Sequence, residues 1–332
     1  MLDIFKTFTE INKCFSPSGN EAEIRKAIEK IAKPYADDIK TDTLGNLIVH
    51  KKGPGKKLML AAHMDSIGLI ATHIEKCGRI RVAAVGGVSP LNIIAAPVRF
   101  RNGTVGTVQA NQDADKAKLT MNDMFVDIGV KDEKEAEKYV KPGDICIYDT
   151  PTYLTAGGEI VSPYTDNRSC CVAQLLALSL VKEPQYELYF VFTVQEEVGL
   201  RGAKPGAFSV DPDYAIACDV TPADNVPGSK HGGNSETGKG AAIKIMDVSV
   251  VCDPAVTGQL EKLAKKNKIA YQRDVITVGG TDAGAIHVSR AGVKTGGISV
   301  PCKYVHSPQE MVAVSDIEAT GKLMAAFCES KM

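Results

Sequence analysis

The chain has 332 residues, 44% of them hydrophobic, and its 39 basic and 40 acidic residues leave a formal net charge of −1. This length is sufficient for a large core and for two domains, while the balanced charge, without a long basic run, argues against nucleic acid and anionic membranes as partners. No apolar segment approaches the roughly 20 residues that span a bilayer, and the amino terminus is acidic where a signal peptide is basic, so we expect a cytoplasmic protein.

The first part of the chain predicts two helices and then a buried strand. Apolar spacing predicts a helix over residues 2–14, and the segment from Ser18 to Glu21 resembles a capping box that opens a second helix. Short strands follow. Residues 57–63 then form a nearly continuous apolar run, which is typical of a strand in the middle of a sheet.

Residues 67–159 differ from the rest of the chain. Many short β-like runs are separated there by Gly and Pro, with a single charged helix near residues 132–139. Beyond residue 160 strands alternate with helices. The strands are predicted at 186–194, 214–218, 241–245 and 293–299, and the helices at 167–181, after Gly202, at 255–267 and at 315–328.

Alternating strands and helices form a largely parallel sheet with helices on both faces. We therefore predict an α/β fold whose mixed, largely parallel sheet is flanked by helices. This α/β domain would be discontinuous, formed by residues 1–66 and 160–332. Residues 67–159 would form a small, inserted, β-barrel-like domain.

Four reactive side chains follow two of the predicted strands. Glu196 and Glu197 stand side by side after an apolar strand, and because side chains alternate, neighbours in such a position usually perform separate tasks. His63 closes another strand, and Asp65 is placed to orient its ring. Taken alone, this H-x-D pattern is more often an ordinary loop histidine.

Three further residues have ordinary explanations when taken singly. Asp166 could cap a helix, Asp219 could start a turn, and His306 could be a loop histidine. Taken together with two of the residues above, they supply two imidazoles and three carboxylates, which suits a two-zinc site with one bridging carboxylate. The five candidate ligands are His63, Asp166, Glu197, Asp219 and His306. Glu196 would then be free to act as a general base.

Eight motifs follow one another along essentially the whole chain. They are DTLGNLIVHK, AAHMDSIGL, DNR, TVQEEVGLRGA, CDVTPA, GKGAAIKIMD, GGTDAGAIHVSRAGV and YVHSPQEMV. In this order they resemble the two-metal aminopeptidases that assemble as tetrahedral dodecamers. That family includes glutamyl, deblocking and leucyl aminopeptidases, and some members were once labelled endoglucanases.

The resemblance implies a division of the ligands between two divalent ions, zinc or cobalt. His63, Asp166 and Asp219 would hold one ion, and Asp166, Glu197 and His306 the other, so that Asp166 bridges them. The peptide bond after Asp166 would be cis.

The resemblance also implies roles for residues that do not bind the ions. Glu196 would be the general base for attack by a metal-bridging hydroxide, and Asp65 would orient His63. Thr281 and Asp282 would help to bind the substrate, a short peptide that loses its amino-terminal residue. The inserted domain would mediate self-association into a dodecamer or a dimer.

Three other functions stay open at this stage. A related two-metal carboxypeptidase or amide deacylase would share the ligands, and a carboxypeptidase would need an arginine for the substrate carboxylate. Arg168 and Arg201 are candidates, although we interpret both as structural ion-pair partners. An endoglucanase needs two facing carboxylates about 5–9.5 Å apart, whereas Glu196 and Glu197 are adjacent. A catalytically silent scaffold would lack a ligand or the base, and none is missing.

Two further histidines and two glycine pairs complete the candidates. We expect neither His231 nor His287 to be a primary metal ligand. The pairs Gly232-Gly233 and Gly279-Gly280 lack the spacing of a phosphate-binding loop, so we interpret both as tight loops that line a pocket.

Overall fold

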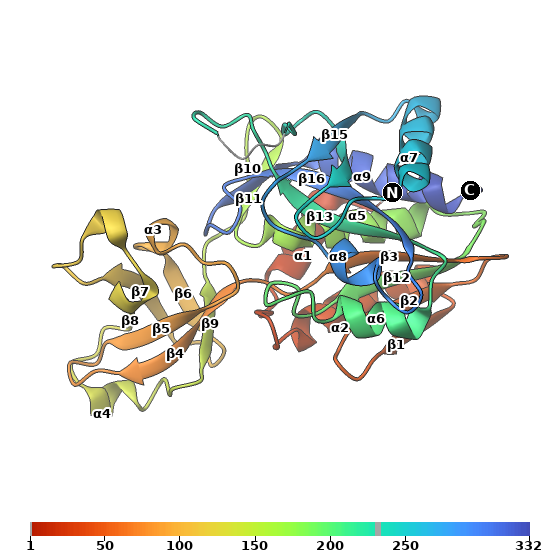
Figure 1. Cartoon of the computed structure of the whole chain (residues 1–332). Helices are drawn as coiled ribbons and strands as arrows, with labels where there is room; N and C mark the ends of the chain where they lie inside the picture. Colours follow the sequence, from red (N-terminus) through yellow and green to blue (C-terminus); the bar gives the residue numbers. More distant parts are fainter. Residues whose placement is uncertain (1, 230–233) are drawn as a thin grey trace.

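The computed structural model describes residues 2–229 and 234–332, arranged as a large α/β body and a smaller barrel to its side (Figure 1). The predictions for His231 and for Gly232-Gly233 lie outside the described residues. No helix within the described ranges is long and apolar enough to cross a membrane.

The α/β body is built on one sheet of 11 strands, in the order β1-β2-β12-β3-β13-β16-β17-β11-β10, with β14 joining β16 and β15 joining β14. At its centre β12, β3, β13 and β16 run parallel. The strands are β1 (Asp38–Thr41), β2 (Leu47–Lys51), β3 (Lys57–His63), β10 (Tyr153–Leu154), β11 (Glu159–Ser162), β12 (Glu187–Thr193), β13 (Tyr214–Pro222), β14 (Ala241–Met246), β15 (Tyr271–Val275), β16 (Lys294–Lys303) and β17 (Glu310–Ala313).

Helices cover both faces of this sheet. They are α1 (Ile4–Asn12), α2 (Ala22–Ala32), α5 (Thr165–Leu180), α6 (Ala203–Val210), α7 (Pro254–Asn267), α8 (Ala283–Ile286) and α9 (Val314–Cys328). Strand β3 shows how the apolar run serves two cores. Leu58 and Leu60 pack in the cluster that includes α1, α2, α5, α7 and α9, whereas Met59 and Ala61 pack with α6 and α8. The alternation of side chains along a strand explains this division, and the predicted fold class is confirmed.

The barrel is closed in the order β4-β5-β8-β7-β6-β9, as the β-rich segment predicts. Its strands are β4 (Gly68–Ile74), β5 (Ile80–Val85), β6 (Pro97–Phe100), β7 (Val105–Ala110), β8 (Met124–Asp127) and β9 (Ile145–Tyr148), and its short helices are α3 (Pro90–Ile93) and α4 (Glu133–Ala136). The barrel has its own apolar core and lies in the chain between β3 and α5. The domain boundaries 1–66, 67–159 and 160–332 stay a prediction.

The predicted capping box at the start of α2 is wrong. Glu21 itself occupies the N-cap position without a capping hydrogen bond from its side chain. Instead, Ser18 Oγ donates to Asp65 Oδ2 at 2.6 Å, and Glu21 Oε1 accepts from the backbone N–H groups of Gly19 and Gln195 at 2.6 and 3.2 Å. Ser18 thus contacts a residue that is distant in the sequence, whereas Glu21 contacts both its neighbour Gly19 and the distant Gln195.

Candidate active site

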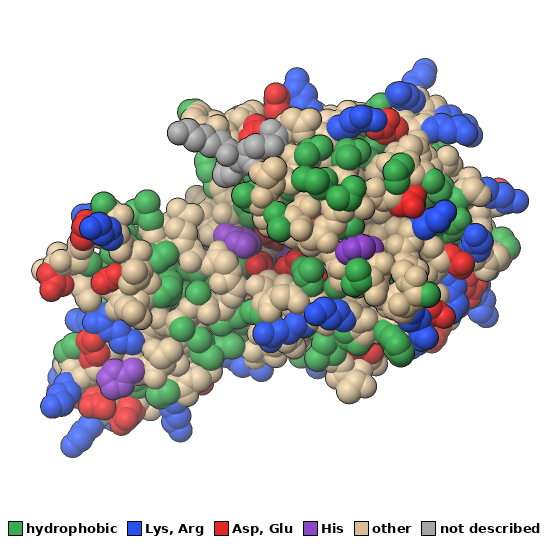
Figure 2. Space-filling view, viewed as in Figure 1, with side chains coloured by type: hydrophobic (Ala, Val, Ile, Leu, Met, Phe, Trp, Pro, Cys, Tyr) green, Lys and Arg blue, Asp and Glu red, His purple; other side chains and the backbone are tan. Residues whose placement is uncertain are grey.

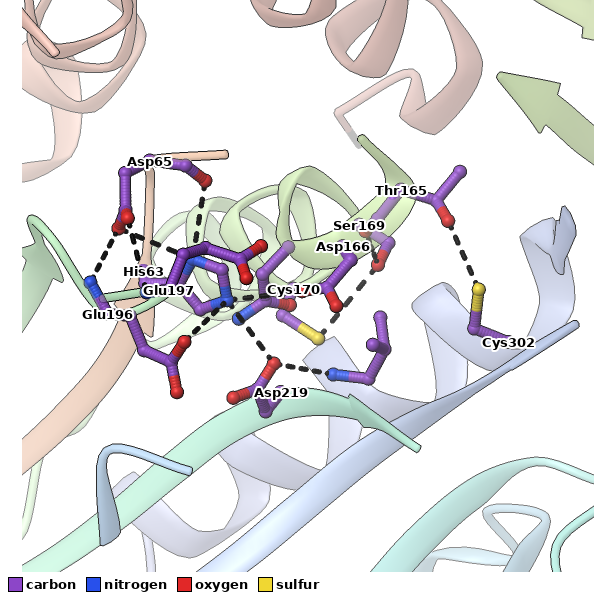
Figure 3. A network of polar contacts seen from close by, with 12 residues as sticks. His63, Asp65, Thr165, Asp166, Ser169, Cys170, Glu196, Glu197, Asp219 and Cys302 are labelled. Carbon is purple, nitrogen blue, oxygen red and sulfur yellow. Dashed lines mark hydrogen bonds and ion pairs between the residues drawn. The ribbon is translucent and has the colours of Figure 1, made fainter. Parts of the chain in front are cut away.

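The candidate site lies at the carboxyl ends of the central parallel strands, where open α/β sheets gather their ligand-binding groups. His63 ends β3, Glu196 and Glu197 follow β12, and Asp219 lies near the end of β13. Asp166 and His306 complete it from the start of α5 and from the β16–β17 turn. Figure 3 shows carboxylates from several of these elements around the imidazole of His63.

Two groups of side chains are spaced as ligands of a common ion. In the first, His63 Nε2 lies 3.1 Å from Asp166 Oδ1 and 3.5 Å from Asp219 Oδ1. In the second, His306 Nε2 lies 3.2 Å from Asp166 Oδ2 and 3.3 Å from Glu197 Oε2. The two oxygens of Asp166 therefore face different histidines, and Asp166 belongs to both groups.

These spacings fit tetrahedral metal coordination. Ligand atoms about 2.0–2.1 Å from a tetrahedral ion lie roughly 3.3 Å from one another, and the four separations above fall between 3.1 and 3.5 Å. Glu197 Oε1 is buried and has no hydrogen-bond partner among the residues that the structure describes, as expected of an oxygen available to a cation. Nitrogen and oxygen donors of this kind accept zinc and other divalent transition metals.

The charge balance of the site also fits bound cations. Four carboxylates with little solvent contact (Asp166, Glu196, Glu197 and Asp219) lie near two imidazoles, of which that of His63 is buried and that of His306 is 33% exposed. Burial, and then the charge of Asp166, raises the pKa of Glu197 above its usual range. Burial also raises the pKa of Asp219, against the opposing effect of His63. Buried anions without sufficient positive charge are costly, and two divalent ions would remove that cost.

The histidines show the complementary effect. Burial acts to lower the pKa of His63, but the nearby charges of Asp219 and Glu196 outweigh it and raise that pKa well above its usual value. Burial likewise acts to raise the pKa of Asp166, and the hydrogen bonds to His306 and His63 reverse this effect and lower it. The site is therefore a tightly coupled cluster of opposite charges.

Glu196 stands apart from both ligand groups. Its Oε2 lies 3.9 Å from His63 Nε2, and it lines the same cavity as the ligands. Burial, followed by the charges of Asp219 and Asp282, raises its pKa well above the usual value, although His63 acts in the opposite direction. A carboxylate with raised pKa beside the ligands has the properties of a proton carrier.

Asp65 fixes the relative positions of His63 and the two glutamates. Its Oδ1 lies 3.5 Å from His63 Nδ1 and accepts from Glu196 N at 3.0 Å, while its Oδ2 accepts from Glu197 N at 3.3 Å and from Ser18. Asp65 thus contacts the His63 ring at Nδ1, the nitrogen that faces away from the carboxylate cluster. This arrangement is common among metal-binding histidines.

Glu310 was not recognised as a site residue from the sequence. Its buried carboxylate accepts from Thr165 Oγ1 and Asp166 N, each at 2.9 Å, and from His306 N at 2.7 Å. Burial, and then the charge of Asp166, raises the pKa of Glu310 to about 8. Glu310 therefore joins the backbones of two candidate ligands, Asp166 and His306, that come from distant segments. Its place two residues after the H-S-P turn was the available signal.

The barrel also reaches the site, through Gly86 and Gly87 after β5. A Cβ atom on Gly87 would lie 2.7 Å from His306 Nδ1, and one on Gly86 would lie 3.2 Å from Glu197 Cβ. Only glycine permits this close approach. The V-G-G-V sequence marked a turn but gave no indication of these contacts.

Backbone conformations around the site are unusual. Gln195, Tyr304 and His306 have positive φ angles of 54°, 59° and 60°, which non-glycine residues seldom adopt and which cluster at functional sites. The Asp166-Asn167 peptide bond is cis, as the family resemblance implies.

The two candidate substrate-binding residues differ in position. Thr281 lines the cavity and donates to Asp247 Oδ2 at 3.0 Å. Asp282 is buried, accepts from Thr193 Oγ1 and is not among the cavity-lining residues. Their substrate-binding roles stay a prediction. His287 Nδ1 lies 3.0 Å from Ala283 O and belongs to neither ligand group.

A cavity of about 410 Å³ opens beside the ligand groups. Figure 2 shows acidic and histidine side chains in a hollow between the barrel and the α/β body, with hydrophobic side chains beside it. Among the described residues, no arginine or lysine lines this cavity. Arg168 is buried, stacks on Tyr164 and has no carboxylate partner within residues 2–229 and 234–332, and Arg201 contacts Gln195 instead. The ion-pair roles predicted for both arginines are therefore wrong.

Comparison with known proteins identifies close relatives. The sequence profile of the family described as M42 glutamyl aminopeptidase matches residues 45–323. The chain is 47% identical over 330 residues to a putative aminopeptidase of Acetivibrio thermocellus, covering 99% of this chain and 98% of the relative. It is 36% identical over 318 residues to a lysyl aminopeptidase of Pyrococcus furiosus, covering 92% of this chain and 91% of the relative.

A solved structure extends the comparison to the whole fold. The TET1 peptidase of Pyrococcus horikoshii, which can assemble into a tetrahedron or a large octahedral shell, superposes with a TM-score of 0.89 at 32% identity. The match covers 99% of this chain and 100% of that one. The resemblance seen in the eight sequence motifs is thus confirmed.

Proposed function

We propose that this chain, which belongs to the M42 glutamyl aminopeptidase family, is a two-metal aminopeptidase that removes amino-terminal residues from short peptides. The observation that carries the proposal is the shared ligand Asp166, whose two oxygens face the two histidines, with Glu196 beside them. Its substrate would lie in the adjoining cavity.

The ligand assignment follows the two groups described above. His63, Asp166 and Asp219 would hold one ion, and Asp166, Glu197 and His306 the other. Zinc and cobalt both suit this set of nitrogen and oxygen donors. Bound there, two divalent ions would polarise the scissile carbonyl and acidify the attacking water.

The remaining steps fall to residues of the chain itself. Glu196 takes the proton of the attacking water and returns it to the leaving amine, as expected of a carboxylate with raised pKa at the edge of the ligand cluster. Asp65 holds the His63 ring and the Glu196 backbone in a fixed position relative to each other. Because water and peptide must be aligned for attack, this positioning contributes to the rate as well as to stability.

The cavity favours an aminopeptidase over a carboxypeptidase. A carboxypeptidase needs a cation, usually arginine, for the terminal carboxylate, and among the described residues none lines the cavity. The site is instead rich in carboxylates, which attract a free ammonium group. An endoglucanase is disfavoured because Glu196 and Glu197 approach different histidines rather than facing each other.

We further propose that the barrel domain, residues 67–159, mediates self-association into a dodecamer or a dimer. Support comes from the assembly of the related TET1 peptidase and from apolar side chains exposed on the barrel, including Leu91, Val105 and Tyr139. Mass photometry of the purified protein tests this assignment. A Val105→Lys variant that keeps the native oligomer, together with equivalent single replacements of Leu91 and Tyr139 that also keep it, would contradict the proposal.

The enzymatic proposal is tested with a panel of aminoacyl chromogenic substrates and a soluble cellulose derivative, each with and without a chelator. We expect cleavage of aminoacyl substrates that disappears on chelation and returns with added zinc or cobalt. Cellulose hydrolysis that survives chelation, or cleavage only from the carboxyl terminus of peptides, would refute it.

A further inference from the structure

Six apolar side chains line the cavity beside the ligands, and we call them the apolar wall. They are Leu200, Val220, Pro222, Ile276, Val278 and Val305. The charged side chains that line the same cavity all belong to the two ligand groups or are Glu196. Among the residues that the structure describes, the part of the cavity outside the chemical centre therefore offers hydrophobic contact without a charged partner of its own.

The wall is held by a buried polar network. Lys244 on β14 pairs with Asp274 on β15, and both side chains are excluded from solvent. Asp274 Oδ1 also accepts from Thr221 Oγ1 at 3.1 Å and from Ser235 Oγ at 3.0 Å. Thr221 stands between the wall residues of β13, and Asp274 precedes those that follow β15.

This network has two consequences for the cavity. It fixes the wall residues of β13 relative to those that follow β15, because the carboxylate of Asp274 near the end of β15 accepts a hydrogen bond from the hydroxyl of Thr221 near the end of β13. It also neutralises Lys244, which is only 1% exposed, so this ammonium group is unavailable to an acidic ligand. The side chain of Val278 is 50% exposed, so its apolar surface is accessible to a ligand.

We infer that the wall receives the first side chain of the substrate and that this enzyme prefers a neutral aliphatic amino-terminal residue, of the size and character of leucine or norleucine. The inference rests on the proposed aminopeptidase function. A glutamate or lysine side chain placed against the wall would lose solvent without gaining a counter-charge from the described part of the chain, which is unfavourable. The preference would thus differ from those in the names of the matching family and of the lysyl relative.

Matched substrates test the inference on the metal-loaded enzyme. Norleucine and lysine share a linear aliphatic stem, and glutamine and glutamate share a shape, so each pair differs mainly in charge. We expect kcat/KM to be at least about tenfold higher for norleucyl than for lysyl p-nitroanilide and for glutaminyl than for glutamyl p-nitroanilide. Leucyl should exceed alanyl by at least about tenfold, since each buried methylene contributes about 10-fold or more.

Failure of the inference and failure of the proposed function give different results. A lysyl or glutamyl substrate that is cleaved fastest would overturn the preference while leaving the aminopeptidase intact. No chelator-sensitive cleavage of any aminoacyl substrate would refute the function itself.

A charge placed in the wall provides the second test. In Val278→Asp, the norleucyl-to-lysyl ratio of kcat/KM should fall at least about tenfold, because the new carboxylate pairs with the lysine ammonium and is unfavourable beside an aliphatic chain. The control is Val288→Asp, since Val288 is 64% exposed and lies outside the wall. An unchanged ratio in Val278→Asp, with both variants folded and loaded with metal, would overturn the inference.

Discussion

Replacement of Glu310 by glutamine tests how the second ligand group is held in place. The carboxylate of Glu310 accepts three hydrogen bonds, from Thr165 Oγ1, Asp166 N and His306 N, at 2.7–2.9 Å. Glutamine keeps the shape of the side chain but replaces one oxygen with an NH₂ group. In either orientation of the amide, at least one of these donors then faces another donor.

The expected cost follows from the burial of these groups. An unsatisfied buried N–H costs about 1–3 kcal/mol, which corresponds to roughly 5- to 150-fold in a binding constant. Loss of the negative charge also makes the site less attractive to cations. In the metal-free protein, relief of the repulsion between Glu310 and Asp166 opposes the lost hydrogen bond, so we expect the effect chiefly in metal affinity rather than in the unfolding of the chelated protein.

Competition between the protein and a metal-binding dye measures that affinity, and urea unfolding of the chelated protein measures stability. The control is Glu318→Gln, because Glu318 is part of an i,i+4 ion pair with Lys322 on α9 that should contribute only about 0.3–0.5 kcal/mol. Equal metal affinity in wild type and Glu310→Gln, with both folded, would refute the role given to Glu310.

Three further substitutions probe other parts of the structure. Gly87→Ala should reduce turnover at least about tenfold by displacing the His306 ring. The control is Gly157→Ala, whose Cβ would meet only Thr155 Oγ1 at 3.9 Å and which should leave kcat/KM unchanged. Equal kinetics in both variants would show that the barrel loop does not contribute to the site. His306→Ala should lower the metal content measured by elemental analysis from two ions per chain toward one, and retention of both would contradict the ligand assignment. Lys244→Met should lower the free energy of unfolding by about 3–5 kcal/mol, because it leaves Asp274 buried and unpaired. In urea titrations, the double variant Lys244→Met/Asp274→Leu should recover most of the lost stability. A single variant as stable as wild type would show that the pair is not buried in solution.

The strand-end residues of the site could be predicted from the sequence for a physical reason. An apolar run without alternation indicates a central parallel strand, and parallel strands bring their carboxyl ends to one edge of the sheet. His63 and Asp219 therefore lie close together, although 156 positions separate them along the chain. Asp166 and His306 lie on segments positioned by tertiary packing. The sequence made them candidate ligands only through their joint placement with the other three, and the family resemblance implied how they divide between the ions.

The remaining site contacts had no usable local signal. Ser18 and Glu21 matched a capping-box pattern, but in the folded chain Ser18 donates to Asp65, and Glu21 accepts from the distant Gln195 N–H as well as from its neighbour Gly19. Gly87 reaches His306 only because the barrel folds back against the α/β body.

Some secondary structure was also missed. Strands β10, β11, β15 and β17 have two to five residues each. Such short segments depend on their neighbours in the sheet more than on intrinsic propensity, so their sequences gave too little pattern to identify them.

The most direct test of the central claim is the metal content and turnover of Glu196→Gln. Because Glu196 belongs to neither ligand group, the variant should keep two ions per chain by elemental analysis. Its kcat should fall about 10²- to 10⁴-fold, the usual contribution of a general base. A variant that keeps both ions and wild-type turnover would contradict the account.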